Sequence, residues 1–104
     1  YTLQIMTTNQ LNDEQMAEAK NWWVFRGFGY GLGVKVHADK STSDNNAPLG
    51  VFGWSGAAGA MPIADIKNGI TIFYEQHMLY DHQGEFESRL LNVIYSCLGD
   101  EVQL

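Results

Sequence analysis

The pattern of hydrophobic and polar positions divides the chain into a helical start, a sheet-forming middle and a helical end. Residues 2–8 are mixed and predict a short helix or the end of one. Asn12 or Asp13 is a suitable N-cap for a second short helix that continues to Lys20. From Trp22 onward, aromatic and β-branched residues become frequent, which is typical of a sheet.

Glycine occupies every second position in the segment 27–33, where it alternates with large side chains. This period of two predicts a strand with one bare face, against which another segment can pack directly on the backbone. Residues 34–37 are expected to continue the same strand. The polar residues 40–48 that follow predict a loop.

Three more strands are predicted after that loop, at about 50–54, 60–66 and 70–78. The last two are separated by Asn68 and Gly69, the strongest short-range signal for a type I′ hairpin. The strands should therefore form an antiparallel sheet.

The period lengthens to that of an amphipathic helix from Gln83 onward. Gly99 is the expected C-terminal cap of this helix. Its predicted apolar face consists of Phe86, Leu90, Val93, Ile94 and Cys97. The expected fold is α+β, with short N-terminal helices, an antiparallel sheet of three to four strands and a C-terminal helix that covers one sheet face.

Composition limits the possible partners. A length of 104 residues gives one modest core, and six Lys and Arg against twelve Asp and Glu give a net charge of −6. The absence of a basic cluster argues against nucleic acid and anionic membranes as partners. No apolar run is long enough to span a bilayer. Cys97 is the single cysteine, so no disulfide framework is expected, and a reducing cytoplasm is compatible.

The chain starts at Tyr1 rather than Met, and its first residues do not have the pattern of a signal peptide. We therefore expect residues 1–104 to be a piece of a longer protein.

The glycine-rich stretch 50–60 is the strongest candidate for a functional site. Its Ser55 lies between Trp54 and Gly56, and closely approached backbone N–H groups beside a hydroxyl are typical of oxyanion-binding sites. The stretch nearly matches the G-x-S-x-G nucleophile elbow, which requires a strand, a sharp turn and a helix. Here Pro62 and a hairpin follow instead, so the elbow is disfavoured.

Two further motifs are better explained by their local context. The spacing of glycines in 27–33 does not fit the nucleotide-binding pattern G-x-G-x-x-G, and no helix follows. The triplet Ser43-Asp44-Asn45 spells the S-D-N element of class A β-lactamases. It lies in a loop rich in these residue types and is too close to Trp54 to be that element, so we interpret it as a coincidence.

Glu75, His77, Asp81 and His82 could together be metal ligands, but they span a strand end and a turn and need not converge. A solvated strand end is the favoured interpretation, and no metal or cofactor is expected.

The aromatic residues Trp22, Trp23 and Phe25 could line a pocket, although burial in the sheet is the commoner explanation. Cys97 is expected to be a small core residue on the last helix.

Three segments together resemble the C-terminal part of the serine β-lactamase-like superfamily. These are Gly29-Tyr-Gly-Leu-Gly33, the run Phe52-Gly-Trp-Ser-Gly-Ala-Ala-Gly59 and the Asn-Gly hairpin. The most similar branch comprises class C β-lactamases and the related esterases and D-amino-acid peptidases. The segment 6–11 also resembles the one that precedes the glycine-rich strand in that branch. The resemblance covers nearly all of this chain, but only the C-terminal portion of the family's domain.

Three motifs build the site in that family, and only the third has a counterpart here. S-x-x-K supplies the nucleophile and a lysine, Y-x-N supplies an acid/base tyrosine, and [KHW]-[ST]-G lines the pocket. Trp54-Ser55-Gly56 matches the third. No serine is followed three residues later by lysine, and no tyrosine two residues later by asparagine. The nucleophile and its base are therefore absent from these residues.

The resemblance also implies roles for the matching residues. Ser55 would hydrogen-bond the acyl or carboxylate group of the substrate, Gly56 would let the substrate lie along the strand, and the N–H of Ala57 would be one of two oxyanion donors. Trp54 replaces the lysine of true β-lactamases, which favours neutral small-molecule esters or amides as substrates of the full-length parent. The fragment itself is expected to be inactive.

The family's sheet continues into strands from the N-terminal part of its domain. Without them an edge would be open, so a homodimer or a strand-swapped assembly is expected at high concentration. The alternative hypothesis is an autonomous protein- or small-ligand-binding module without catalysis, which would use the glycine strand and the aromatic residues as its binding surface.

Overall fold

The computed structural model describes residues 1–79, 83–100 and 102. The chain folds as an α+β domain with five strands, against the expected three to four. The elements are α1 (Thr2–Met6), α2 (Asp13–Ala19), the 3₁₀ turn η1 (Trp23–Phe25), β1 (Phe28–Tyr30), β2 (Lys35–His37), β3 (Phe52–Gly53), β4 (Met61–Asp65), β5 (Ile70–Tyr74) and α3 (Gln83–Ser96).

The N-cap predicted for the second helix is confirmed at Asn12. Its side chain accepts a hydrogen bond from the Gln15 N–H at 2.8 Å, and the Asn12 N–H donates to Oε1 of Gln15 at 3.0 Å. This reciprocal capping box satisfies two backbone groups that would otherwise lack partners at the start of α2. Both N-terminal helices thus lie where the sequence predicts them.

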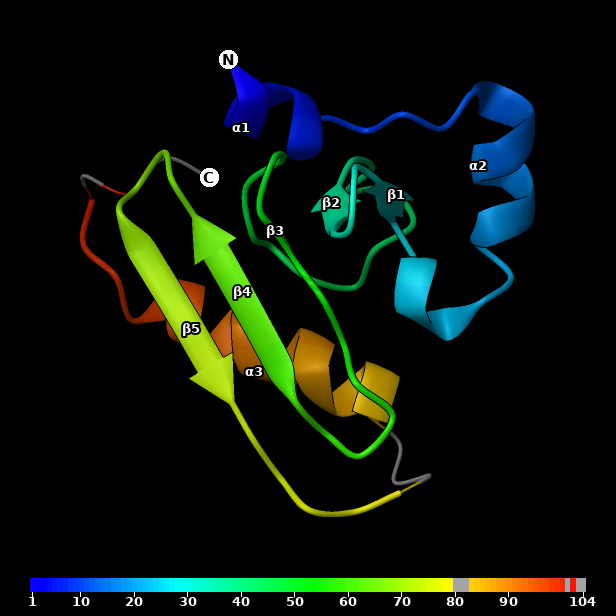
Figure 1. Cartoon of the computed structure of the whole chain (residues 1–104). Coiled ribbons are helices and arrows are strands. Elements are labelled where there is room, and N and C mark those ends of the chain that lie inside the picture. The colour runs from blue at the N-terminus through cyan, green and yellow to red at the C-terminus, as the bar shows by residue number, and fades with distance from the viewer. Residues whose placement is uncertain (80–82, 101, 103–104) are drawn as a thin grey trace.

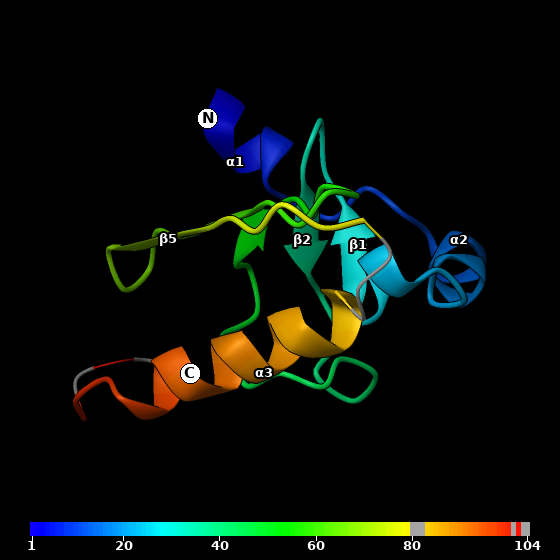
Figure 2. The ribbon, with the colours of Figure 1, turned by 90° about the horizontal axis from the view of Figure 1, so that it is seen from below.

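The strands form one antiparallel sheet in the order β1-β2-β3-β4-β5, so each strand pairs with its neighbour in the chain. Figure 1 shows the long β4–β5 ribbon on one side and the short strands β1 and β2 on the other. Seen from below, α3 runs along a single face of the sheet (Figure 2). Among the residues that the structure describes, no helix lies across the opposite face of β4 and β5 (Figure 2).

The single strand expected over residues 27–37 is wrong, because this segment forms the β1–β2 hairpin. The Gly31 N–H donates to the Val34 carbonyl at 2.8 Å, and Gly33 has a φ of 85°. Gly29 consequently pairs with Val36. A positive φ is readily available only to glycine, so the alternating pattern concealed a turn.

The β4–β5 hairpin is confirmed, but its turn differs from the predicted two-residue type I′. Asp65 pairs with Ile70, which leaves the four residues 66–69 in the loop. The Asp65 Oδ1 atom accepts a hydrogen bond from the Asn68 N–H at 3.1 Å, and Gly69 has a φ of 68°. The Asp65 side chain thus stabilises this turn together with the Asn68-Gly69 pair.

The bare face predicted for the glycine-rich segment is filled by the N-terminal segment. Oδ1 of Asn9 accepts a hydrogen bond from the Tyr30 N–H at 3.1 Å, and the Leu32 N–H donates to the Met6 carbonyl at 2.9 Å. A Cβ atom at Gly29 would collide with the Asn9 side chain. The glycines therefore allow the N-terminal segment to lie directly on the β1 hairpin.

The main core lies between α3 and the β4–β5 ribbon. It consists of Ala47, Val51, Met61, Ile63, Leu91 and Tyr95. The buried residues of α3 are Gln83, Glu87, Leu91 and Tyr95, which follow one another at intervals of four.

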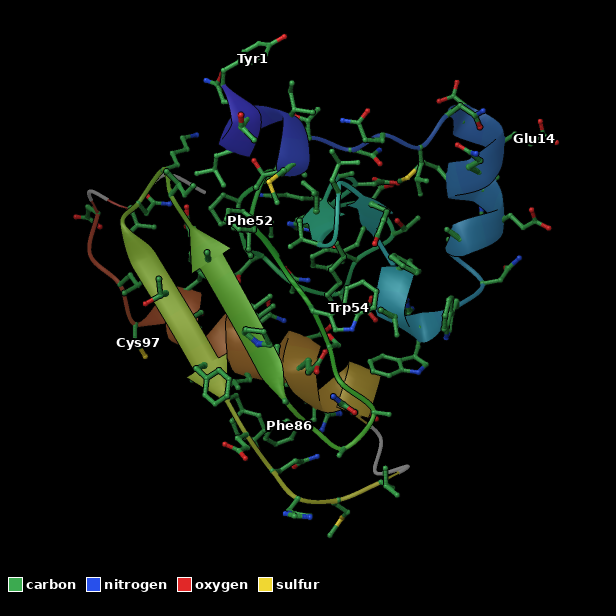
Figure 3. All side chains as sticks on the ribbon, in the orientation of Figure 1. Tyr1, Glu14, Phe52, Trp54, Phe86 and Cys97 are labelled. Carbon is green, nitrogen blue, oxygen red and sulfur yellow. The ribbon has the colours of Figure 1, made fainter. Side chains whose placement is uncertain are left out.

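The predicted apolar face of the last helix is confirmed only in part, because Leu90 packs against the core but none of the predicted residues is among the buried ones. Phe86 and Val93 are exposed, as is Cys97, which lies near the outer end of the helix and is not a core residue (Figure 3). The helix ends at Ser96, so Gly99 lies beyond the capping position.

The aromatic residues around η1 also differ from the expectation of burial in a strand. Trp22 and Trp23 are exposed by 59% and 41%, and only Val24 of this turn is buried. They occupy a 3₁₀ turn because the chain must leave α2 and enter β1 within a few residues.

Candidate functional site

The stretch Trp54–Ala57 leaves the end of β3 and enters a tight turn that leads to β4. The Trp54 N–H donates to the Pro62 carbonyl at 3.1 Å, so the strand pairing extends one residue beyond Gly53. The Gly56 N–H donates to the Ala60 carbonyl at 2.7 Å, and the Gly59 N–H donates to the Gly56 carbonyl at 3.1 Å. These bonds close residues 56–60 into a compact loop.

The Trp54 side chain lies on the surface, where it joins an aromatic cluster. Its ring makes edge-on contacts with Phe25 and Tyr30, at centroid distances of 5.8 and 6.1 Å. Trp22 continues the cluster through Phe25 at 5.4 Å. Figure 3 shows Trp54 at the end of β3 beside η1. Phe25 of η1 thus packs between the Trp54 and Trp22 rings, whereas the pocket interpretation of these aromatic residues stays a prediction.

Ala57 is exposed at the start of the loop. Within the described part of the chain, its N–H makes no hydrogen bond. An exposed N–H group with no internal partner is available to a bound oxygen atom. The backbone of the predicted oxyanion donor is therefore open to solvent.

The Ser55 hydroxyl points toward α3, and only 4% of this residue is exposed. Its Oγ atom lies 2.6 Å from Nζ of Lys35 and 2.7 Å from Oε2 of Glu87. The hydroxyl accepts from the ammonium group and donates to the carboxylate. In this conformation its hydrogen-bonding capacity is used inside the protein.

Lys35 lies in the middle of this buried network. Its Nζ atom also donates to the Val24 carbonyl at 3.3 Å and lies 4.5 Å above the centre of the Phe28 ring. Burial lowers the pKa of Lys35 from 10.5 to about 8, against the opposing effect of the Glu87 carboxylate, which raises it. The Lys35 ammonium group is therefore a buried cation that has lost much of its hydration.

Two residues of α3 complete the network from one side. Nε2 of Gln83 donates to Oε1 of Glu87 at 2.9 Å and to the Gly56 carbonyl at 2.6 Å. Residues four apart on a helix lie one above the other, so Glu87 reaches the Ser55 hydroxyl and Gln83 the Gly56 carbonyl from the same side of the helix. Each buried polar atom of this group thus has a hydrogen-bonding partner.

A cavity of about 50 Å³ adjoins the network. Lys35, Glu87, Trp23 and Asn45 contribute to its lining. A space of this size can hold a water molecule or a small ion but no ester or amide substrate. A ligand larger than this would therefore have to lie outside the cavity.

A larger hollow of about 550 Å³ lies on the open face of the sheet. Its lining is mostly apolar and includes Phe52, Trp54, Pro62, Ala64 and Phe73. Phe73 is 69% exposed. Trp54 thus precedes the loop of residues 56–60 (the Ala57 turn) and also borders the open sheet face.

A second buried pair holds the polar loop against β2. Nε2 of His37 lies 2.7 Å from Oγ of Ser43, and its Nδ1 lies 3.1 Å from the Pro48 carbonyl oxygen. Burial lowers the pKa of His37 below its ordinary value. Ser43, the first residue of the S-D-N triplet, is thus engaged in anchoring its own loop.

The metal hypothesis involves residues that the structure describes only in part. Asp81 and His82 lie outside the described residues, whereas Glu75 and His77 are included. Over residues 1–79, 83–100 and 102, no group of three or more His, Cys, Asp or Glu side chains converges to hold a metal ion.

The sequence indicated Trp54–Ala57 as a candidate site, but it did not indicate the buried side chains that bind Ser55 and Gly56. Lys35 is a lone lysine between two valines, and Gln83 and Glu87 are spaced one helical turn apart. A charged residue at an inward strand position indicates a buried partner, but it does not say which one. The structure joins three segments that are distant in the sequence.

No protein-family model and no curated protein matches this chain. Within its described residues, none of the helices has the length and apolar character needed to cross a bilayer.

Proposed function

We propose that this chain is the C-terminal sheet-and-helix portion of a β-lactamase-like serine hydrolase. The full-length parent would hydrolyse a neutral small-molecule ester or amide through an acyl-serine intermediate. This portion would supply one wall of the pocket, and residues 1–104 would form part of a domain. The proposal rests on the resemblance of the ordered motifs in the sequence.

The observation that carries the proposal is the exposed Ala57 N–H on the turn that directly follows β3. A backbone N–H that has no internal partner can serve as one of the donors of an oxyanion-binding site. Trp54 lies three positions before Ala57 in the sequence, and its ring offers an apolar surface rather than a cation. Such a surface suits an uncharged substrate.

The motif implies that the Ser55 hydroxyl binds the substrate, but in the conformation described this hydroxyl has other partners. It is bonded to Lys35 and Glu87, so a substrate contact through this group would require those bonds to exchange. The contact remains a prediction. The groups that face solvent in this conformation are the Trp54 indole and the Ala57 N–H.

The chain by itself has no S-x-x-K or Y-x-N motif. Without a nucleophile, an oxyanion donor has no covalent intermediate to stabilise. Burst-phase acylation by a chromogenic ester tests this point directly. We expect no burst from the 104-residue chain, and a stoichiometric burst would contradict the assignment.

The parent reading frame provides the positive test. Upstream S-x-x-K and Y-x-N motifs are expected, together with ester hydrolysis by the full-length protein. In that protein Ala57→Pro removes the N–H donor and should lower kcat by about 10²-fold or more. Ala58→Pro is the matched control, because it removes the neighbouring N–H. An upstream region without these motifs would contradict the proposal.

The second candidate is a protein- or small-ligand-binding module without catalysis. The apolar hollow bordered by Phe52, Trp54 and Phe73 favours it, because exposed apolar surface of this kind often marks a binding site. An unrelated upstream domain, or none, would support this alternative. Neither nucleic acid nor a membrane is proposed as a partner.

A further inference from the structure

The polar side chains of α3 that face the sheet are placed at one spot, behind the Ser55–Gly56 backbone. Gln83 and Glu87 are exposed by only 8% and 5%. Between them they bind the Ser55 hydroxyl and the Gly56 carbonyl, at 2.7 and 2.6 Å. The later buried positions of the same helix, Leu91 and Tyr95, pack in the main core instead.

This polar cluster does not follow from the requirements of stability alone. Removing a carboxylate and an ammonium group from water costs free energy that their attraction only partly offsets, and apolar residues of similar volume are often as stable or more so. Leu91 of the same helix is an apolar residue at a comparable buried position. Stability alone therefore does not account for the polar residues at 83 and 87.

The Ala57 turn depends on these contacts for its attachment to the helix. Residues 56–60 are closed by their own backbone bonds, and the Gly56 carbonyl accepts hydrogen bonds from both the Gly59 N–H and Gln83. A Cβ atom at Gly56 would have no neighbour nearer than 3.6 Å, so packing holds this backbone only loosely. Directional hydrogen bonds from α3 take the place of close packing.

We propose that Gln83 and Glu87 are positioning residues, which fix the direction of the Ala57 N–H by holding the Ser55 hydroxyl and the Gly56 carbonyl from behind. This role rests on the proposed function of the Ala57 turn, but the geometry itself can be measured without any activity. Neither residue contacts the surface on which substrate would bind.

The network also connects the loop of residues 56–60 to the ammonium group of Lys35, which can lose a proton. Lys35 donates a hydrogen bond to the Ser55 hydroxyl, and this hydroxyl donates to Glu87. Gln83 donates to both Glu87 and the Gly56 carbonyl. The Glu87 carboxylate raises the pKa of Lys35 against the larger effect of burial. Among the described residues, the other charged or titratable groups near Lys35 are Arg26 and Asp44 at the adjoining cavity and His37, which stacks on the Phe28 ring.

The test is carbon-detected NMR of the complete 104-residue chain, with the Gly56 carbonyl carbon as the reporter. In the wild type its chemical shift should titrate with a midpoint near pH 8, as Lys35 loses its proton. Glu87→Gln should move that midpoint about one pH unit lower, because the attraction that raises the pKa of Lys35 is lost. Gln83→Leu should abolish the titration at Gly56 while Ser55 still titrates.

Glu85→Gln is the matched control, since it removes the same charge from an exposed site on the same helix. It should leave the midpoint unchanged. If Glu87→Gln does not fold, the uncharged Gln83→Leu substitution still decides the question. A Gly56 signal that titrates in Gln83→Leu as it does in the wild type would overturn the proposal.

The full-length parent separates this inference from the proposed function. There Gln83→Leu should lower kcat about tenfold with KM little changed. A misdirected Ala57 N–H would weaken mainly the hydrogen bond that it makes in the transition state. A normal NMR response in a parent without hydrolase activity would refute the proposed function and leave the positioning intact. A parent in which Gln83→Leu leaves kcat unchanged would refute the positioning role.

Discussion

Nζ of Lys35 lies 2.6 Å from Oγ of Ser55, although 20 positions separate the two residues in the sequence. Lys35 is on β2 and Ser55 follows β3, and the antiparallel register that pairs Lys35 with Gly53 brings them together. The serine and lysine that the hydrolase family supplies within one S-x-x-K motif are absent here. The pair in this chain is buried and structural, and it faces away from the open side of the site.

The first prediction concerns the stability of the Lys35–Ser55–Glu87 network. Glu87→Leu should destabilise the fold by about 3–5 kcal/mol, because it leaves a buried ammonium group without its counter-charge. Adding Lys35→Met to Glu87→Leu should recover most of that loss. Urea unfolding of both variants measures the difference, and a double variant no more stable than Glu87→Leu would contradict the coupling.

The second prediction is a rise in stability between pH 8 and 10. The folded state releases the Lys35 proton near pH 8, whereas the unfolded chain keeps it to about 10.5. The unfolded state therefore binds more protons in this window, and the free energy of unfolding should increase by about 2 kcal/mol.

The same pH profile should turn downward above pH 10. Burial and the Asp65 carboxylate, which accepts a hydrogen bond from the Tyr95 hydroxyl at 2.7 Å, raise the pKa of that hydroxyl. Above pH 10 the Tyr95 hydroxyl loses its proton in the unfolded chain before it does so in the folded protein, and this favours unfolding. Lys35→Met should flatten the rise and Tyr95→Phe the fall. A profile unchanged in Lys35→Met would show that another group controls the rise.

The third prediction distinguishes two glycines of the 50–60 stretch. A Cβ atom at Gly53 would collide with the Pro62 carbonyl oxygen in the β3–β4 ladder, so Gly53→Ala should cost about 2 kcal/mol or more. At Gly56 the nearest atom is 3.6 Å away, and Gly56→Ala should change stability by less than about 1 kcal/mol. Thermal unfolding of both variants makes the comparison, and equal losses would contradict it.

The fourth prediction concerns self-association through the open face and edge of the β5 side. The residues of β5 carry no charge, and Phe73 is 69% exposed. We expect dimers in sedimentation experiments at millimolar concentration, and Phe73→Lys should suppress them. Leu3→Lys, which places the same charge on exposed α1, should not. A strictly monomeric wild type up to this concentration would contradict the expectation.

Local patterns predicted much of the secondary structure. The capping box at Asn12, the hairpin near Asn68-Gly69 and the strand composition around Met61–Asp65 depend on residues within a few positions of one another. Their energies are largely set before any long-range contact forms. The turn at Gly33 was missed because an alternating glycine pattern fits both a bare strand and a hairpin with a positive φ.

The candidate wall was predicted for the same reason, as a contiguous run from Trp54 to Ala57. Its supports could not be predicted, because Lys35, Gln83 and Glu87 come from other elements. Their positions follow from the sheet register and from the rotation of α3 about its axis. The apolar pattern predicted a face with Phe86 and Cys97 inward, whereas Glu87 and Gln83 are buried.

Outside the β1–β2 hairpin, the sequence by itself determined the order of helices and strands and the position of the Trp54–Ala57 turn, since both depend on short-range propensity. Only the tertiary structure decided which way each side chain of that turn points. Burial of Glu87 is possible only because Ser55 and Gln83 bind its carboxylate, with Lys35 one hydrogen bond away. That balance of desolvation against hydrogen bonding exists only after the sheet and α3 have come together.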